Sequence, residues 1–276
     1  MRKKEIVLLD FSGAFKEQEF WKKRDTVQIQ TGDIQGTNCY CDEEAADCLR
    51  ECIGPYGAGG VHFLDSGNYH YMSRLWLEKM EEPFCLILFD NHTDMQPPAF
   101  GGLLSCGGWA AAALEELPLL KHILLIGPDQ AAWGLVSEEH RDRVDFLSRE
   151  ELSDITDKKA FLESCRLREY ADKKMPLYLS VDKDILCAED AVTTWSQGDM
   201  HLSELLEWIS DIFAFAEERG ISVMGADICG EADEPFTGGE KNDRANESLL
   251  FLLEEKRLLH RQEPERQNKG DKKDEK

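Results

Sequence analysis

Short apolar runs alternate with longer amphipathic stretches along most of the chain. The runs have the length of buried strands and are bounded by turn-forming residues; they lie at residues 5–11, 61–65, 84–89, 121–126, 176–181 and 221–228, with weaker ones at 24–30, 134–136 and 144–147. Helical spacing between them predicts helices at about 41–53, 71–79, 109–117, 157–169, 202–219 and 246–259. Strands that alternate with helices predict an α/β fold, a three-layer αβα arrangement whose central sheet is mostly parallel.

The length of 276 residues suits one large α/β domain. No internal repeat and no linker interrupts the pattern before its end, so we predict a single domain over residues 1–260. Residues 261–276 contain no apolar residue, and we expect a disordered, charged tail there. The loop at 95–108 is rich in glycine and proline, and a loop of this kind beyond a strand is expected to contact a ligand.

Charge and cysteine content narrow the class of protein. The net charge is −23 and no basic stripe precedes the last sixteen residues, so nucleic acid and anionic membranes are poor partners and cationic small molecules are favoured. No apolar run is long enough to span a bilayer, and the first is too short for a signal peptide. Nine scattered cysteines fit reduced thiols, and we expect a cytoplasmic protein. The spacings within the group from Cys39 to Cys52 match no common zinc module.

Acidic residues and a histidine follow two of the apolar runs. Asp90, His92 and Asp94 come directly after the run at 84–89, and Asp182 and Asp184 follow the run at 176–181. On an extended chain alternate residues share a face, with neighbours roughly 6–7 Å apart. Bringing both strand ends together gathers four carboxylates, which would repel one another unless cations or protons neutralise them. Two divalent ions would do so, and we predict a metal site here.

These motifs resemble the arginase–agmatinase (ureohydrolase) family. That family has a Gly-Gly-Asp-His element, then Asp-x-His-x-Asp, then Ser-x-Asp-x-Asp. Residues 90–94 match the second, residues 180–184 match the third, and the segment from Ser66 to His70 is similar to the first. Residues 194–200 and 225–228 are similar to the family's later glycine-rich loop and last core strand, so that the resemblance spans about 60–255.

The resemblance implies an arginase/deacetylase-like fold and a site for two divalent ions, most often Mn²⁺. One ion would be held by His70, Asp90, Asp94 and Asp182. The other would be held by His92, Asp90, Asp182 and Asp184. A metal-bridging hydroxide would attack a trigonal carbon, and Asp94 would accept its hydrogen bond. The resemblance also implies assembly into a homo-oligomer.

Two departures from the family concern catalysis. Where arginases carry a proton-shuttling histidine, this chain has Cys106, which is either a catalytic substitute or a small buried thiol. The residue that corresponds to the family's guanidinium-binding glutamate lies one position later in this chain, as Glu231 after Gly230. A backbone bulge would bring Glu231 into place, and a change of substrate is the alternative. The catalytic candidates are therefore Asp94, Glu231 and Cys106.

The expected activity is hydrolysis of a C–N bond in a small guanidino, formimino or related amidine or amide compound. A deacetylase-like amide hydrolase is disfavoured, because that class usually has a tandem histidine pair and none is present. The remaining alternative is a protein that keeps the metals and the fold but only binds a ligand or partner.

Overall fold

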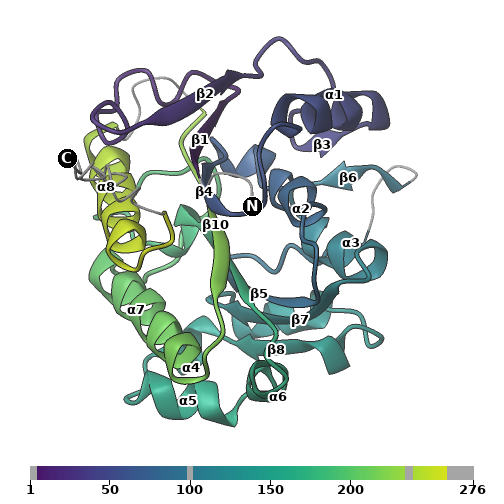
Figure 1. The fold of residues 1–276 in the computed structure, drawn as a ribbon, viewed down its shortest axis with the longest axis vertical. Coiled ribbons are helices and arrows are strands. Elements are labelled where there is room, and N and C mark those ends of the chain that lie inside the picture. Colours follow the sequence, from purple (N-terminus) through teal and green to yellow (C-terminus); the bar gives the residue numbers. More distant parts are fainter. Residues whose placement is uncertain (1–4, 98–101, 234–238, 260–276) are drawn as a thin grey trace, which may run out of the picture.

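The computed structural model describes residues 5–97, 102–233 and 239–259. Its centre is an eight-stranded, all-parallel sheet (Figure 1), which confirms the predicted α/β class. The strands, in their order across the sheet, are β2 (Thr26–Gln30), β1 (Glu5–Asp10), β4 (Gly60–Phe63), β10 (Val223–Cys229), β9 (Leu177–Asp182), β5 (Phe84–Phe89), β7 (Leu120–Ile126) and β8 (Val144–Leu147).

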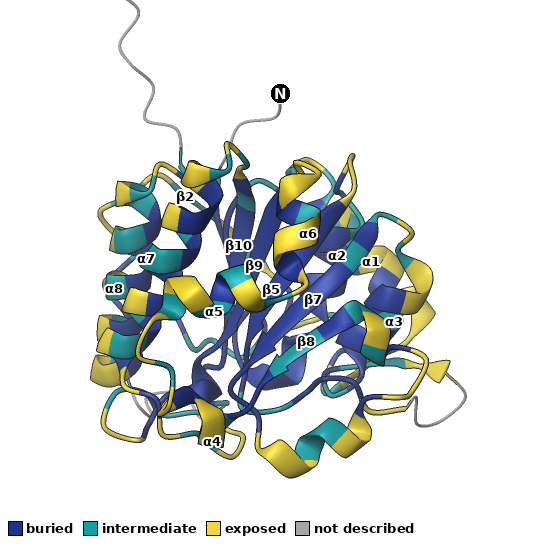
Figure 2. Cartoon of the chain, turned by 90° about the horizontal axis from the view of Figure 1, so that it is seen from below, coloured by how far each residue is buried: buried dark blue, intermediate teal, exposed yellow. Residues whose placement is uncertain are grey.

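Helices cover both faces of this sheet. One face carries α1 (Glu43–Ile53), α2 (Met72–Leu77) and α3 (Trp109–Glu116). The other carries α4 (Arg149–Leu152), α5 (Lys158–Ser164), α6 (Leu167–Asp172), α7 (Leu202–Glu218) and α8 (Gly239–Glu255). The helices turn exposed residues outward, whereas the strands between them are buried (Figure 2). The predicted three-layer architecture is thus confirmed.

Strand β5 shows why the apolar runs form the middle layer. All six of its residues are buried, and its side chains point alternately to the two faces. Cys85, Ile87 and Phe89 belong to the core cluster under α4–α8, while Phe84, Leu86 and Leu88 belong to the cluster under α1–α3. A strand buried on both faces reads as a continuous apolar run, which is typical of parallel sheets.

Several elements differ from the sequence prediction. Residues 134–136, expected as a strand, end a 3-10 helix at Gln130–Leu135, whose start is capped by the Asp129 side chain accepting from the Ala131 N–H. The helix expected at 157–169 is divided at Cys165, whose backbone is extended, into α5 and α6. Helix α8 begins at Gly239, seven residues before the expected 246.

A small antiparallel sheet was not predicted. It pairs β3 (Tyr40–Cys41) with β6 (Leu104–Ser105). Each strand has two residues, too few for a sequence period to mark it. The predicted tail at 261–276 and part of the predicted ligand loop, residues 98–101, lie outside the described residues.

The order of the strands creates a crevice at the carboxyl edge of the sheet. Strands β4 and β5 follow one another in the chain but are separated in the sheet by β10 and β9. Ligands of open α/β sheets bind where the strand order changes in this way. The segments after β4, β5 and β9 all emerge at this edge, so the candidate residues meet there.

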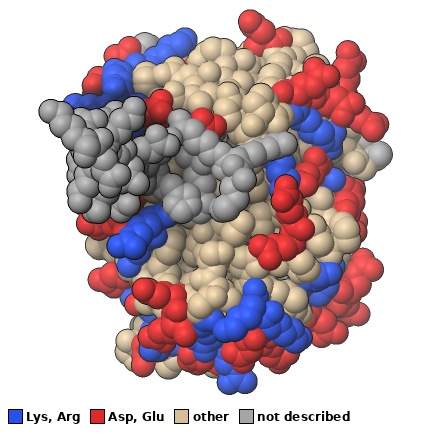
Figure 3. Space-filling model, viewed as in Figure 1, with Lys and Arg blue, Asp and Glu red and all other residues tan. Residues whose placement is uncertain are grey.

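The surface and the helices give little further guidance on partners. On the face shown in Figure 3, acidic side chains are interspersed with basic ones. Among the helices in the described ranges, none has the length and apolarity needed to cross a membrane.

Candidate metal centre

The structure brings all six predicted metal ligands together at the carboxyl edge of the sheet. Strands β5 and β9 are hydrogen-bonded neighbours with Phe89 opposite Val181, so Asp90 and Asp182 follow side by side. His70 lies in the segment that connects β4 to α2. Five of the six are buried, and His92 is intermediate.

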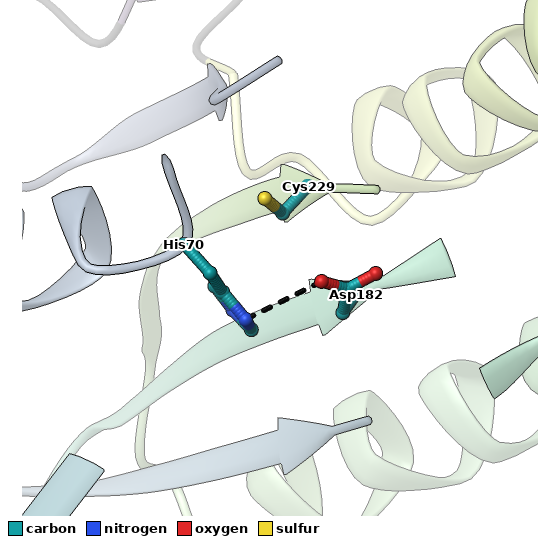
Figure 4. A group of neighbouring side chains, drawn as sticks. All are labelled: His70, Asp182 and Cys229. Carbon is teal, nitrogen blue, oxygen red and sulfur yellow. Dashed lines mark ion pairs between the residues drawn. The ribbon is translucent and has the colours of Figure 1, made fainter. Parts of the chain in front are cut away.

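His70 faces three of the carboxylates. Its Nδ1 lies 2.9 Å from Asp94 Oδ2, 3.3 Å from Asp90 Oδ2 and 3.5 Å from Asp182 Oδ2. Figure 4 shows the ring of His70 directed at the Asp182 carboxylate, with the Cys229 thiol on the neighbouring strand β10. A single N–H on Nδ1 can satisfy only one of three oxygens, so this arrangement suits a cation better than a hydrogen bond.

His92 faces the remaining carboxylates in the same manner. Its Nδ1 lies 2.8 Å from Asp184 Oδ2 and 3.4 Å from Asp90 Oδ1. Asp90 therefore presents Oδ2 to His70 and Oδ1 to His92, which is the disposition of a carboxylate that bridges two ions. Its Oδ2 is buried without a hydrogen-bond partner among the described residues, although buried polar atoms are rarely left unpaired.

The carboxylates are held in place by backbone N–H groups. The N–H of His92 donates to Asp90 Oδ1 at 2.6 Å, that of Asp184 to Asp182 Oδ1 at 2.9 Å, and that of Asn91 to Asp184 Oδ1 at 3.0 Å. The last of these joins the end of β5 to the end of β9. Each of these three aspartates thus has one oxygen fixed by the backbone and the other directed at an imidazole.

Electrostatics show that the cluster needs positive charge. Burial, together with Asp184 and Asp90, raises the pKa of Asp182 well above its ordinary value, and burial and Asp90 raise the pKa of Asp184 to about 6. Burial disfavours the charged form of His92, but its contacts with Asp184 and Asp90 outweigh this and raise its pKa to about 11. Positive charge beside the carboxylates, from protonated imidazoles or from metal ions, relieves their mutual repulsion.

A second ring of residues orients the two imidazoles. Nε2 of His70 lies 3.0 Å from Ser180 Oγ, and Ser180 in turn donates to buried Asp227, which Ser73 also contacts at 3.0 Å. Metal-binding histidines commonly have their other ring nitrogen held in this way, which fixes the tautomer.

His92 is held in the same way at its other nitrogen. Its Nε2 lies 2.9 Å from Ser196 Oγ. Both histidines therefore turn Nδ1 to the carboxylates and Nε2 to a serine.

Asp94 stands at a special backbone position. Its φ of 51° lies in the left-handed region, so residues 90–94 form a bend beyond β5 rather than the extended segment assumed from the sequence. Asp94 Oδ2 accepts from Trp109 Nε1 at 2.6 Å as well as facing His70. No hydrogen bond involves its Oδ1 within the described parts of the chain.

Gly230 approaches the centre closely. Its φ is +89°, and a Cβ at this position would lie 2.3 Å from Asp182 Oδ1. A side chain there would displace a candidate ligand, so glycine is needed both for the conformation and for the space.

A pocket of about 230 Å³ opens onto the six residues. Its other described walls are uncharged, and are made by Cys39, Tyr40, Gly67, Gln96, Pro97, Ser105, Cys106, Gly107 and Trp195. Trp195 stands edge-on to His92 with ring centroids 5.9 Å apart. Burial and the nearby Asp94 raise the pKa of Cys106, so its thiol stays neutral near pH 7.

Glu231 is not among the described residues that line this pocket. Its carboxylate is buried and pairs with Lys183, and it accepts from Gln18 Nε2 at 2.8 Å and Asn242 Nδ2 at 2.9 Å. The expectation that Glu231 faces the substrate therefore does not match its position. Strand β9 ends at Asp182, and Lys183 begins a short 3-10 helix at Lys183–Ile185, from which its side chain reaches Glu231 and Asn246.

Sequence reasoning missed most of this supporting structure. Lys183 reads as one charged residue between two aspartates, yet 1% of its side chain is exposed. Ser196 lies in the segment similar to the family's glycine-rich loop, but neither its role nor that of Trp109 was predicted, because these roles depend on contacts 104 and 15 residues away along the chain. The serine of Ser-x-Asp-x-Asp was the one available hint, since its period-two spacing places Ser180 at the same edge.

Comparisons with known proteins identify the family and the fold. The chain is 29% identical over 249 residues to an uncharacterized protein of Thermotoga maritima, covering 90% of this chain and 89% of that one. Its fold is similar to that of proclavaminate amidino hydrolase from Streptomyces clavuligerus (TM-score 0.64, 14% identity, 94% of each chain covered). It is also similar to that of arginase from Bacillus caldovelox (TM-score 0.63, 16% identity, 91% of this chain and 98% of that one). The model of the arginase family matches residues 9–231, and the chain therefore belongs to the arginase family.

Proposed function

We propose that this protein is a dinuclear-metal hydrolase that cleaves a non-peptide C–N bond in a small guanidino, formimino or amidine compound. The observation that carries the proposal is the position of Asp90. Its two carboxylate oxygens face two different imidazoles, and its Oδ2 has no hydrogen-bond partner among the described groups. Membership of the arginase family supports the same reaction class.

The donor set suits the proposed ions. His70, Asp90, Asp94 and Asp182 would hold one ion, and His92, Asp90, Asp182 and Asp184 the other. Oxygen-rich sites with imidazole ligands favour hard or borderline dications such as Mn²⁺. Two dications held by these residues would supply Lewis acidity, which would polarise the substrate and lower the pKa of a water molecule toward neutrality.

The protein's own residues then position and accept protons. Oδ2 of Asp94 is held by Trp109, which leaves Oδ1 to accept the hydrogen bond of the attacking water. The Ser180 and Ser196 hydroxyls hold the two imidazoles in one tautomer and orientation. We propose a positioning role for Glu231, because the partner of its carboxylate is Lys183 and not the pocket.

The uncharged walls constrain the substrate. Its positive charge would be met by the carboxylate end of the pocket, and the rest of the molecule would lie against Trp195 and Tyr40. A volume of about 230 Å³ fits a small molecule. The reaction class named for the structural neighbour from Streptomyces clavuligerus, an amidino hydrolase, is compatible with this site.

One observation favours a second candidate function. Cys106 lines the pocket as a neutral thiol and Glu231 pairs with Lys183, so neither of these two catalytic candidates presents a charged group to the pocket. A metal-containing protein that binds a ligand without turnover would fit these two features.

One experiment separates the two functions. The protein is stripped with chelator, reloaded with Mn²⁺ and incubated with guanidino, formimino and amidine compounds while urea, ammonia and formamide are measured. The hydrolase predicts release from at least one compound, and loss of that release in Asp94→Asn at unchanged expression. No release from any compound at two ions per chain would support the binding function instead.

A further inference from the structure

A second group of metal-binding side chains lies outside the site described above. Cys187, Asp190 and His201 come together where the segment between β9 and α7 begins and ends. They share no residue with the six ligands at the sheet edge. We propose that these three residues form a site for a single borderline dication such as Zn²⁺, which would link the two ends of this segment.

The three donor atoms form a nearly equilateral triangle. Cys187 Sγ lies 3.3 Å from His201 Nδ1 and 3.6 Å from Asp190 Oδ2, and His201 Nδ1 lies 3.2 Å from the same Oδ2. A tetrahedral zinc ion with bonds of about 2.3 Å to sulfur and about 2.0–2.1 Å to nitrogen and oxygen separates its ligand atoms by about 3.3–3.6 Å. The triangle therefore already has the size of one face of such a tetrahedron.

The three donor atoms are of three different chemical kinds and all face one another. The Cys187 thiol donates to Asp190 Oδ2, and His201 presents its Nδ1 to both the thiol sulfur and this carboxylate oxygen. The Glu189 carboxylate also lies against the Cys187 thiol. A thiol and two carboxylates around one imidazole are the mixture of sulfur, nitrogen and oxygen donors that zinc binds, with Glu189 or water available as a fourth ligand.

The surroundings orient the ligands and leave a route for the ion. Asp190 Oδ1 is held by Arg244 at 3.0 Å, and Oδ2 also accepts from the Leu202 N–H at 2.9 Å, the first residue of α7. Such contacts fix a ligand's direction. The Cys187 side chain is buried, whereas 66% of the His201 side chain is exposed, so an ion can enter from that side.

The position of the triangle gives the ion a structural role. The backbone N–H of Cys187 donates to Met200 O at 2.8 Å, so the two ends of the segment already meet there. Between them the segment carries Ser196, which holds His92, and Trp195, which walls the pocket. An ion at Cys187 and His201 would fix both ends of the segment that completes the candidate centre.

The test uses cobalt as the probe, because a thiolate bound to Co²⁺ gives a charge-transfer absorption band that carboxylate and imidazole ligands do not give. The full chain is stripped with chelator, saturated with Mn²⁺ to occupy the Asp and His ligands, and then titrated with Co²⁺. We expect one equivalent of Co²⁺ to produce the band, and Cys187→Ser and His201→Gln each to abolish it. Excess Zn²⁺ should remove the band from the unmodified chain by competition.

Matched variants keep the test falsifiable. Cys165→Ser removes a half-buried thiol that belongs to none of the described metal-binding groups, and it should keep the full band. Cys229→Ser removes the thiol beside His70 and should also keep it. A band that persists in Cys187→Ser and disappears in Cys229→Ser would assign the thiolate to the sheet edge and overturn the proposal. Absence of any band at saturating Co²⁺, in protein whose melting curve shows it to be folded, would overturn it as well.

Discussion

The buried pair between Lys183 and Glu231 offers the sharpest test of how the sheet edge is built. The exposed fractions of the two side chains are 1% and 3%, and Glu231 also accepts from the amides of Gln18, Asn242 and Asn246. Glu231→Gln removes the negative charge and leaves the Lys183 ammonium buried among neutral groups. Breaking a buried pair by removing one partner costs about 3–5 kcal/mol, because the remaining charge is uncompensated.

The assay is urea and thermal unfolding of the Mn²⁺-loaded and the chelated protein. For a chain of this size the expected loss lowers the melting temperature by roughly 6–20 °C. A matched control is Glu218→Gln, which removes one partner of the surface pair with Lys159, whose side chain is 54% exposed. Because this pair is exposed to solvent, its loss should leave the melting temperature nearly unchanged. The double variant Lys183→Met with Glu231→Leu should recover much of the stability lost by Glu231→Gln.

The contrary result is equally specific. If Glu231→Gln unfolds within about 1 kcal/mol of the unmodified protein and yet loses substrate binding or turnover, the carboxylate faces the pocket in the working protein. The position described here, with Glu231 paired to Lys183, would then be refuted, and the guanidinium-binding role expected from the family would be restored.

Three further predictions concern the metal centre and the pocket. Ser180→Ala should weaken Mn²⁺ binding by about 10–100-fold, measured by competition with a fluorescent chelator, because His70 loses the partner of its Nε2; an unchanged affinity would show that the hydroxyl is dispensable. Trp195→Ala should raise KM for any substrate found in the screen by about tenfold, whereas Trp133→Ala, remote from the pocket, should leave KM unchanged. In the chelated protein, the free energy of unfolding measured with urea should fall as pH rises from about 6.5 to 11. Burial opposes the charged form of His92, but the neighbouring carboxylates outweigh burial and raise the pKa of His92 in the folded state to about 11. The stabilisation is complete below the pKa of histidine in the unfolded chain and is lost between the two pKa values. In His92→Asn this fall should be smaller, and an equal fall would assign it to other groups.

The arrangement of the sheet was predictable because it follows from local patterns. The continuous apolar runs of β5 and β9 could only be buried on both faces, which requires a parallel sheet with helices on each side. The gathering of Asp90 and Asp182 then followed from the common direction of neighbouring parallel strands. The reasoning that residues 90–94 stay extended did not match the structure, since the left-handed backbone of Asp94 turns the chain.

The environment of the centre was less predictable because it depends on distant contacts. The network around Glu231 joins Gln18, 213 residues away, with Asn246 on α8, and neither residue forms a motif. The same holds for Cys187 and His201, which are fourteen positions apart and meet because the segment between them folds back on itself. Spacing along the chain carries no information on such pairs until the fold is known.

In the proposed enzyme, two dications occupy the space between His70 and His92. The most direct measurement is anomalous diffraction from crystals soaked in Mn²⁺. We predict two peaks about 3.5–4 Å apart, with one oxygen of Asp90 directed at each. A single peak, or none between the two imidazoles at saturating Mn²⁺, would contradict the dinuclear centre and the hydrolytic function that rests on it.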